Sequence, residues 1–283
     1  MSIETFNDLD MANWKEYGDL ITDSLWLLGP RDKTGPHAGD FHGNFVPQIP
    51  RQVIQRFTKL GEVVVDLFSG MGTTLIECRY LGRHGVGVEL QKEVNLRARE
   101  RIDRASNPDL VSTYLLTGDS RLDSTRDRIE SKLDGVGYRH AHHIILHPPY
   151  WNIIRFSNGN PSDLSSLPDL ATFYTEFGRV ARQAFNLLQP GRFMTLVIGD
   201  KYARGEWIPL GFGCMQACQD AGFRLKAINV KDVQGNEKSK GKASNLWRYR
   251  ALKGGFYLFK HEYVMVFQKR GQGLGQRQGQ RQP

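Results

Sequence analysis

The stretch VVVDLFSGMGTTLIE, residues 63–77, indicates the fold of this chain. The apolar, β-branched run over 62–68 is typical of a buried strand, and residues 73–82 are typical of a helix that ends at a glycine. Between them, Gly70 and Gly72 allow a sharp turn and let the backbone approach a ligand closely. The stretch therefore predicts one unit of a parallel α/β sheet, in which ligands bind beyond the carboxyl ends of the strands.

The rest of the chain repeats this alternation of short apolar strands and helices. We expect the further strands in residues 84–90, 111–120, 142–150, 192–200, 223–233 and 257–269. We expect helices in residues 91–105, 170–188 and 208–222. Such alternation is typical of a parallel sheet covered on both faces. The predicted fold class is α/β, with a doubly wound, Rossmann-like, mostly parallel sheet of seven strands and an antiparallel edge strand.

The charge of the chain is unevenly distributed. Residues 229–283 hold 12 Lys and Arg against 3 Asp and Glu, a net charge of +9, whereas the whole chain carries +8. This favours a polyanionic partner, with a solvated basic tail as the alternative. The three cysteines are too few for a disulfide framework, and no run of eighteen apolar residues could span a membrane. The acidic amino-terminal stretch does not resemble an export signal, so we expect a cytoplasmic protein.

Three acidic residues, Asp66, Glu89 and Asp119, end successive predicted strands. The ends of parallel strands meet at one edge of the sheet, so we expect these side chains to lie close together. Glu89 follows the glycine loop at a distance typical of a carboxylate that binds ribose hydroxyls. Asp119 could accept a hydrogen bond from an adenine amino group or cap a helix. The pattern favours a nucleoside cofactor, while Leu75 in place of the third glycine of the dinucleotide fingerprint disfavours NAD.

The predicted strand 142–150 ends in His147-Pro148-Pro149-Tyr150. Proline cannot donate a ladder hydrogen bond, so the strand stops here and the element faces the same edge as the three carboxylates. The rigid Pro-Pro pair fixes a backbone carbonyl as a hydrogen-bond acceptor. A conjugated amine would become a better nucleophile if two such acceptors held its hydrogens.

The motifs DLFSGMGTT, Glu89, GDS and PPYW together resemble those of the DNA amino-methyltransferases, which methylate adenine N6 or cytosine N4 with S-adenosylmethionine. The resemblance covers residues 20–269 and implies the class I methyltransferase fold. It implies a site-specific DNA methyltransferase that acts on a base rotated out of the duplex, with double-stranded DNA as its partner. It leaves a homodimer and a cognate restriction endonuclease open as further partners.

The resemblance also implies roles for individual residues. The implied catalytic residues are His147, Pro148, Pro149 and Tyr150. The implied cofactor-binding residues are His42, Asn44, Asp66, Phe68, Gly70, Gly72, Thr73, Glu89, Asp119 and Ser120. The residues implied to contact the base or the DNA are Tyr150, Trp151, Lys238, Lys240 and Lys242. No metal ligand is implied, since the histidines of RHAHHIILH (139–147) would alternate between the two faces of a strand.

The resemblance divides the chain into three parts. Residues 1–60 form an amino-terminal arm and a segment that completes the cofactor site. Residues 61–269 form the catalytic methyltransferase domain, with 152–168 and 231–255 as candidate DNA-recognition insertions. Residues 270–283, rich in Gly, Gln and Arg, are expected to be disordered.

His147 departs from the family, which usually has Asp, Asn or Ser at this position. A neutral imidazole accepts a hydrogen bond in one tautomer only, and an imidazolium cannot accept one. His147 therefore either works as a neutral acceptor, with activity lost below about pH 6.5, or marks an inactive cofactor-binding or DNA-binding relative. An uncharged acceptor favours cytosine N4 over adenine N6 as the target. The alternative to a DNA methyltransferase is an RNA or protein amide methyltransferase. Asp200 and Glu262 are not assigned, because either could be structural.

Overall fold

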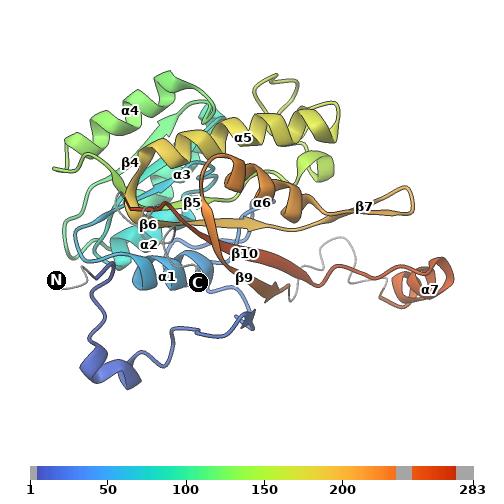
Figure 1. The fold of residues 1–283 in the computed structure, drawn as a ribbon, viewed down its shortest axis with the longest axis horizontal. Helices are drawn as coiled ribbons and strands as arrows, with labels where there is room; N and C mark the ends of the chain where they lie inside the picture. The colour runs from blue at the N-terminus through green and yellow to red at the C-terminus, as the bar shows by residue number, and fades with distance from the viewer. Residues whose placement is uncertain (1–4, 234–243, 272–283) are drawn as a thin grey trace, which may run out of the picture.

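The structure is a computed structural model that describes residues 5–233 and 244–271 (Figure 1). The predicted DNA contacts Lys238, Lys240 and Lys242 and nearly all of the predicted tail lie outside the described residues. Within the described ranges, no helix is long and apolar enough to cross a lipid bilayer.

The centre of the fold is an eight-stranded sheet with the order β1-β9-β10-β6-β5-β2-β3-β4. Its strands are β1 (Leu25–Trp26), β2 (Val63–Asp66), β3 (His84–Glu89), β4 (Thr113–Thr117), β5 (Ala141–Leu146), β6 (Leu188–Ile198), β9 (Arg224–Asp232) and β10 (His261–Gln268). β10 is antiparallel to both of its neighbours, and the other pairings in this sheet are parallel. The predicted doubly wound, mostly parallel α/β sheet is confirmed. The sheet has eight strands rather than the predicted seven, because the short edge strand β1 is added. The predicted edge position of the antiparallel strand is wrong, because β10 lies between β9 and β6 and pairs with both.

Helices cover both faces of the sheet (Figure 1). One face carries α1 (Gln48–Phe57), α2 (Thr73–Tyr80) and α3 (Lys92–Asp103). The other carries α4 (Asp123–Asp134), α5 (Leu170–Leu187) and α6 (Leu210–Asp220). Short 3-10 helices lie at Met11–Glu16, Trp151–Ile153 and Leu164–Ser166.

The continuous apolar runs of the strands explain this two-sided cover. In β2, the side chains of Val63 and Val65 belong to the core under α4, α5 and α6, while Val64 belongs to the core under α1. Successive strand residues point to opposite faces, so a strand that is apolar at every position requires helices on both sides. Cys214 and Cys218 are buried in the α6 core, as helix packing predicts.

A hairpin and a helix extend from the body on the same side (Figure 1). The hairpin consists of β7 (Lys201–Ala203) and β8 (Glu206–Ile208), and the helix is α7 (Ser244–Gly254). The ring of Tyr202 stacks on Phe256 with centroids 4.9 Å apart, so the hairpin contacts the segment that follows α7. The helix falls within the predicted recognition segment 231–255.

Candidate active site

A cavity of about 870 Å³ opens at the carboxyl ends of the strands. Small-molecule sites typically enclose about 300–1,000 Å³. The cavity is lined by most of the predicted site residues, namely His42, Asn44, Phe68, Gly70, Thr73, Glu89, Asp119, Ser120, His147, Pro148, Pro149 and Tyr150. Asp66, Gly72 and Trp151 do not line the cavity. Each of them is directly next in sequence to a residue that does.

Asp66 holds the glycine loop in shape. Its carboxylate accepts hydrogen bonds from the Phe68 amide at 2.9 Å and from the Thr74 hydroxyl at 2.5 Å. Burial raises the pKa of Asp66 to about 6, although these hydrogen bonds oppose the shift. Asp66 therefore acts on the cavity indirectly, by fixing the path of the loop.

The two loop glycines have different reasons for being glycine. Both have positive φ, +50° at Gly70 and +79° at Gly72. A Cβ on Gly72 would lie 2.7 Å from Cδ1 of Ile102 in α3, whereas a Cβ on Gly70 would meet only Phe41, at 3.9 Å. Gly72 therefore allows the loop to pack on α3, and Gly70 is the glycine that lies on the cavity wall.

Glu89 forms the part of the wall best suited to a ribose. The Glu89 carboxylate accepts a hydrogen bond from the Gln91 amide at 2.8 Å. Burial raises the pKa of Glu89, while backbone hydrogen bonds oppose the shift. The Ser69 amide donates to the Val88 carbonyl at 2.9 Å, and the Ser69 hydroxyl is buried without a partner among the described residues. This hydroxyl lies against β3, where a Cβ on Gly87 would be 2.6 Å from it, so the protein itself encloses it.

Asp119 lies on the cavity but is already bound by Arg121. Arg121 donates from Nε at 3.0 Å and from Nη2 at 2.7 Å, and it also pairs with Glu176. Burial would raise the pKa of Asp119, but the Arg121 hydrogen bonds outweigh it and lower the pKa. Ser120 Oγ donates to the Leu67 carbonyl at 2.6 Å, which ties the end of β4 to the glycine loop.

Helix α2 holds the segment that precedes the glycine loop against the cavity. Thr73 Oγ1 donates to Asn44 Oδ1 at 2.7 Å. His37 Nε2 lies 2.7 Å from Glu77 Oε1, and both side chains are buried. These contacts place Asn44 and the exposed His42 on the wall, as the predicted role of the arm requires.

A chain of polar contacts connects the His-Pro-Pro-Tyr element to the last two strands. His147 Nε2 lies 3.3 Å from the Tyr150 hydroxyl, which donates to Glu262 Oε2 at 2.8 Å. Glu262 Oε1 lies 3.0 Å from Lys231 Nζ, and the two residues are directly opposite in the β10–β9 ladder. All four residues line the cavity.

The sequence did not assign Glu262 or Lys231 to the site. A charged residue within a strand was the sequence signal that could have identified them. The sequence does not show that β9 and β10, which carry the two residues, are neighbours in the sheet. Burial lowers the pKa of His147 to about 4; Glu262 opposes this shift and Lys231 adds to it. The imidazole is therefore neutral near pH 7, and the expected loss of activity below about pH 6.5 is revised to about pH 4.

Tyr150 and Trp151 have different surroundings. A Cβ on Gly199 would lie 2.9 Å from the Tyr150 ring, so the ring packs against the end of β6. The Trp151 indole donates to the Leu167 carbonyl at 3.0 Å, and Lys201 Nζ lies 4.5 Å from the ring centroid. Trp151 is thus held by the segment 152–168, and its predicted base contact stays a prediction.

The clustered histidines point in different directions. His142 Nδ1 accepts from the Val63 amide at 3.1 Å, whereas His143 Nε2 lies 3.1 Å from Thr195 Oγ1. In the part of the chain that the structure describes, no three His, Cys, Asp or Glu side chains gather in a way that could hold a metal ion.

Comparisons with known proteins find similarity over parts of the chain. A family model described as DNA methylase matches residues 5–99. The type II methyltransferase M.MjaI of Methanocaldococcus jannaschii is 31% identical over 91 residues, 32% of this chain and 30% of that protein. The type II methyltransferase M.HpaI of Haemophilus parainfluenzae is 40% identical over 47 residues, 17% of this chain and 15% of that protein. Among solved structures, TrmN from Thermus thermophilus aligns with 80% of this chain and 49% of its own, at 18% identity and a TM-score of 0.47.

The family match contains the glycine loop and Glu89 but ends before His147. The aligned segments span less than a third of the curated relatives. Both relatives are nevertheless type II methyltransferases, in agreement with the family model. Residues 5–99, which contain the glycine loop and Glu89, are therefore the part of this chain that is similar to the DNA methylase family.

Proposed function

We propose that this protein transfers a methyl group from S-adenosylmethionine to an exocyclic amino group of a DNA base. The observation that carries the proposal is that one cavity joins the glycine loop and Glu89 to the His147–Tyr150 element. The first group of residues suits a nucleoside cofactor, and the second suits a target amine. A cytoplasmic location and double-stranded DNA as the partner are parts of this proposal.

The cavity wall fits the nucleoside portion of the cofactor. Glu89, which lines the cavity, would accept the ribose hydroxyls. Gly70 leaves the backbone open on the same wall. When bound, S-adenosylmethionine would supply the electrophilic methyl group.

The His-Pro-Pro-Tyr element would prepare the target amine. An exocyclic amine delocalises its lone pair into the base, so it is a weak nucleophile. The neutral His147 imidazole and the Pro148 carbonyl could each accept one amine hydrogen, which would favour the pyramidal, nucleophilic form. Tyr150 would stack on the base once it is rotated out of the duplex, a contact worth about 1–3 kcal/mol.

We favour cytosine N4 over adenine N6, because His147 is an uncharged acceptor. The segment 152–168 and helix α7 are the proposed DNA-recognition elements. A homodimer and a cognate restriction endonuclease are further proposals, which size measurement and co-purification would test.

Sequencing of modified bases in DNA from cells that express the protein tests this function. We expect N4-methylcytosine at one short recognition sequence. The His147→Ala variant should greatly reduce the modification, and His140→Ala, a change of a histidine outside the cavity, should not. N6-methyladenine would change the base but keep the reaction. Methylation of RNA or protein only, or cofactor binding without methylation of any substrate, would contradict the proposal.

A further inference from the structure

We infer that Glu262, paired with Lys231, is a positioning residue that fixes His147 in the tautomer with its proton on Nε2 and its acceptor lone pair on Nδ1. The inference deepens the proposed function and rests on it. It explains how a histidine can serve as an acceptor at this position.

The Tyr150 hydroxyl has a single proton and two neighbours that could accept it. That oxygen lies 2.8 Å from Glu262 Oε2 and 3.3 Å from His147 Nε2. Hydrogen bonds to a carboxylate are shorter and stronger than those to a neutral acceptor. The proton is therefore donated to Glu262, and the Tyr150 oxygen can only accept from His147.

This requirement determines the tautomer of His147. Because the Tyr150 oxygen is an acceptor, Nε2 must carry the imidazole proton, and Nδ1 of the neutral ring must be unprotonated. Nδ1 makes no hydrogen bond to any residue within 5–233 or 244–271, and it is not among the buried atoms that lack a partner. Nδ1 is thus accessible, on a side chain that lines the cavity.

Two further contacts keep the arrangement in place. Lys231 is 6% exposed and pairs with Glu262 at 3.0 Å, so the carboxylate is not left as a lone charge. The ring of Phe45 packs against the imidazole with centroids 4.8 Å apart, which restricts reorientation of the His147 ring.

The molecule contains a second arrangement of the same kind that serves as a control. His261 Nε2 lies 3.3 Å from the Tyr263 hydroxyl, which donates to Asp200 Oδ2 at 3.0 Å. None of these three residues lines the cavity. A change there should alter His261 and leave His147 unaffected.

The test is nuclear magnetic resonance of the full chain labelled with ¹⁵N-histidine, with the His147 signals assigned by their loss in His147→Gln. We expect the Nε2–H tautomer in the unmodified protein. In Glu262→Met, the Tyr150 proton has only His147 Nε2 as acceptor, so the tautomer should switch to Nδ1–H. Methylation should then fall at least tenfold, because the acceptor is lost.

A double variant guards against misfolding of Glu262→Met. Lys231→Met with Glu262→Met removes both charges together, which avoids an unpaired buried ammonium, and should show the same switch. Tyr263→Phe should leave the His147 signals unchanged. An Nδ1–H tautomer in the unmodified protein, or an Nε2–H tautomer in both variants, would overturn the inference. An Nε2–H tautomer in a protein that methylates nothing would support the inference and contradict the proposed function.

Discussion

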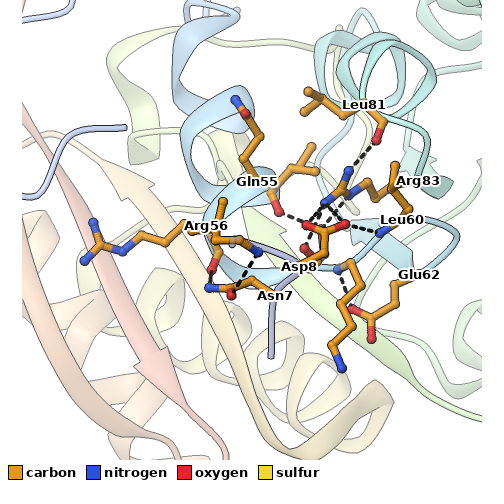
Figure 2. A network of polar contacts seen from close by, with 12 residues as sticks. Asn7, Asp8, Gln55, Arg56, Leu60, Glu62, Leu81 and Arg83 are labelled. Atoms are coloured by element: carbon orange, nitrogen blue, oxygen red, sulfur yellow. Dashed lines mark hydrogen bonds and ion pairs between the residues drawn. The ribbon is translucent and has the colours of Figure 1, made fainter. Parts of the chain in front are cut away.

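The two ends of the central sheet both carry polar side chains, but the side chains at one end bind each other and those at the other end line a cavity. At the amino ends of the strands, Arg83 donates to Asp8 at 2.9 Å (Figure 2) and to the Thr58 carbonyl at 2.9 Å. Glu62 pairs with Arg192 at the same end. At the carboxyl ends, Nδ1 of His147 has no partner among the described residues, and its side chain lines the cavity. The amino ends of the strands are thus a closed end, where the polar groups bind each other. The carboxyl ends are an open end, which keeps contacts available for a ligand.

The closed end also fixes the beginning of the arm. Figure 2 shows Asp8 beside Arg83, and the Leu60 amide donates to Asp8 Oδ2 at 2.7 Å. Asn7 donates to the Arg56 carbonyl at 2.9 Å. These contacts hold the arm at one end of the sheet, while its later residues line the cavity at the other end. Substitutions at the two ends should therefore have separable effects.

The largest effect is expected at the closed end. Glu62→Ala would leave Arg192 buried without its partner, so the free energy of unfolding should fall by about 3–5 kcal/mol. Urea denaturation measures this loss. Adding Arg192→Met should recover much of it, and methylation per folded molecule should stay unchanged. A large loss of kcat in the folded double variant would mean that the two ends are not independent.

At the open end, His147→Ala should reduce kcat by about 10²–10³, as expected when one group of a preorganised polar site is removed. Cofactor affinity by calorimetry and the melting temperature should change little. His147→Asp should retain or raise activity, because it restores an acceptor common in the family. If the parent is inert and His147→Asp creates activity, His147 is an inactivating residue.

The two loop glycines sharpen the comparison within the open end. Gly72→Ala forces a methyl group to within 2.7 Å of Ile102, so we expect a loss of about 1–3 kcal/mol in stability. Gly70→Ala has the unfavourable φ but no such clash, so it should lower cofactor affinity more than stability. Thermal unfolding with and without S-adenosylmethionine distinguishes a loss of stability from a loss of cofactor affinity. Equal effects of both variants on both measurements would contradict the different roles.

The smallest effect is expected from pH in the neutral range. Because the pKa of His147 is lowered to about 4, the ring keeps its acceptor from pH 8 down to about pH 5. Below pH 4, log kcat should fall by about one unit per pH unit, since the imidazolium cannot accept a hydrogen bond. Single-turnover rates with bound DNA measure the profile. A midpoint near pH 6.5 would show that His147 is not desolvated.

The sequence was sufficient where the signal is local. The apolar run before Asp66, the glycines after it and the proline pair after His147 each restrict the backbone directly, so the strand ends and most of the cavity wall were predicted. Long-range features were not predicted. The pairing of Glu262 with Lys231 depends on which strands become neighbours, and the reason for Gly72 depends on a side chain in α3.

The position of β10 in the sheet has a consequence for the order of folding. β10 follows every other strand of the sheet in the chain, yet it lies between β9 and β6. Its insertion requires contacts that are distant in sequence, which form slowly because loop-closure entropy opposes them. During synthesis, the β2–α2 loop and β3 can therefore assemble well before Glu262 has left the ribosome. The residue that orients His147 is among the last to reach its place.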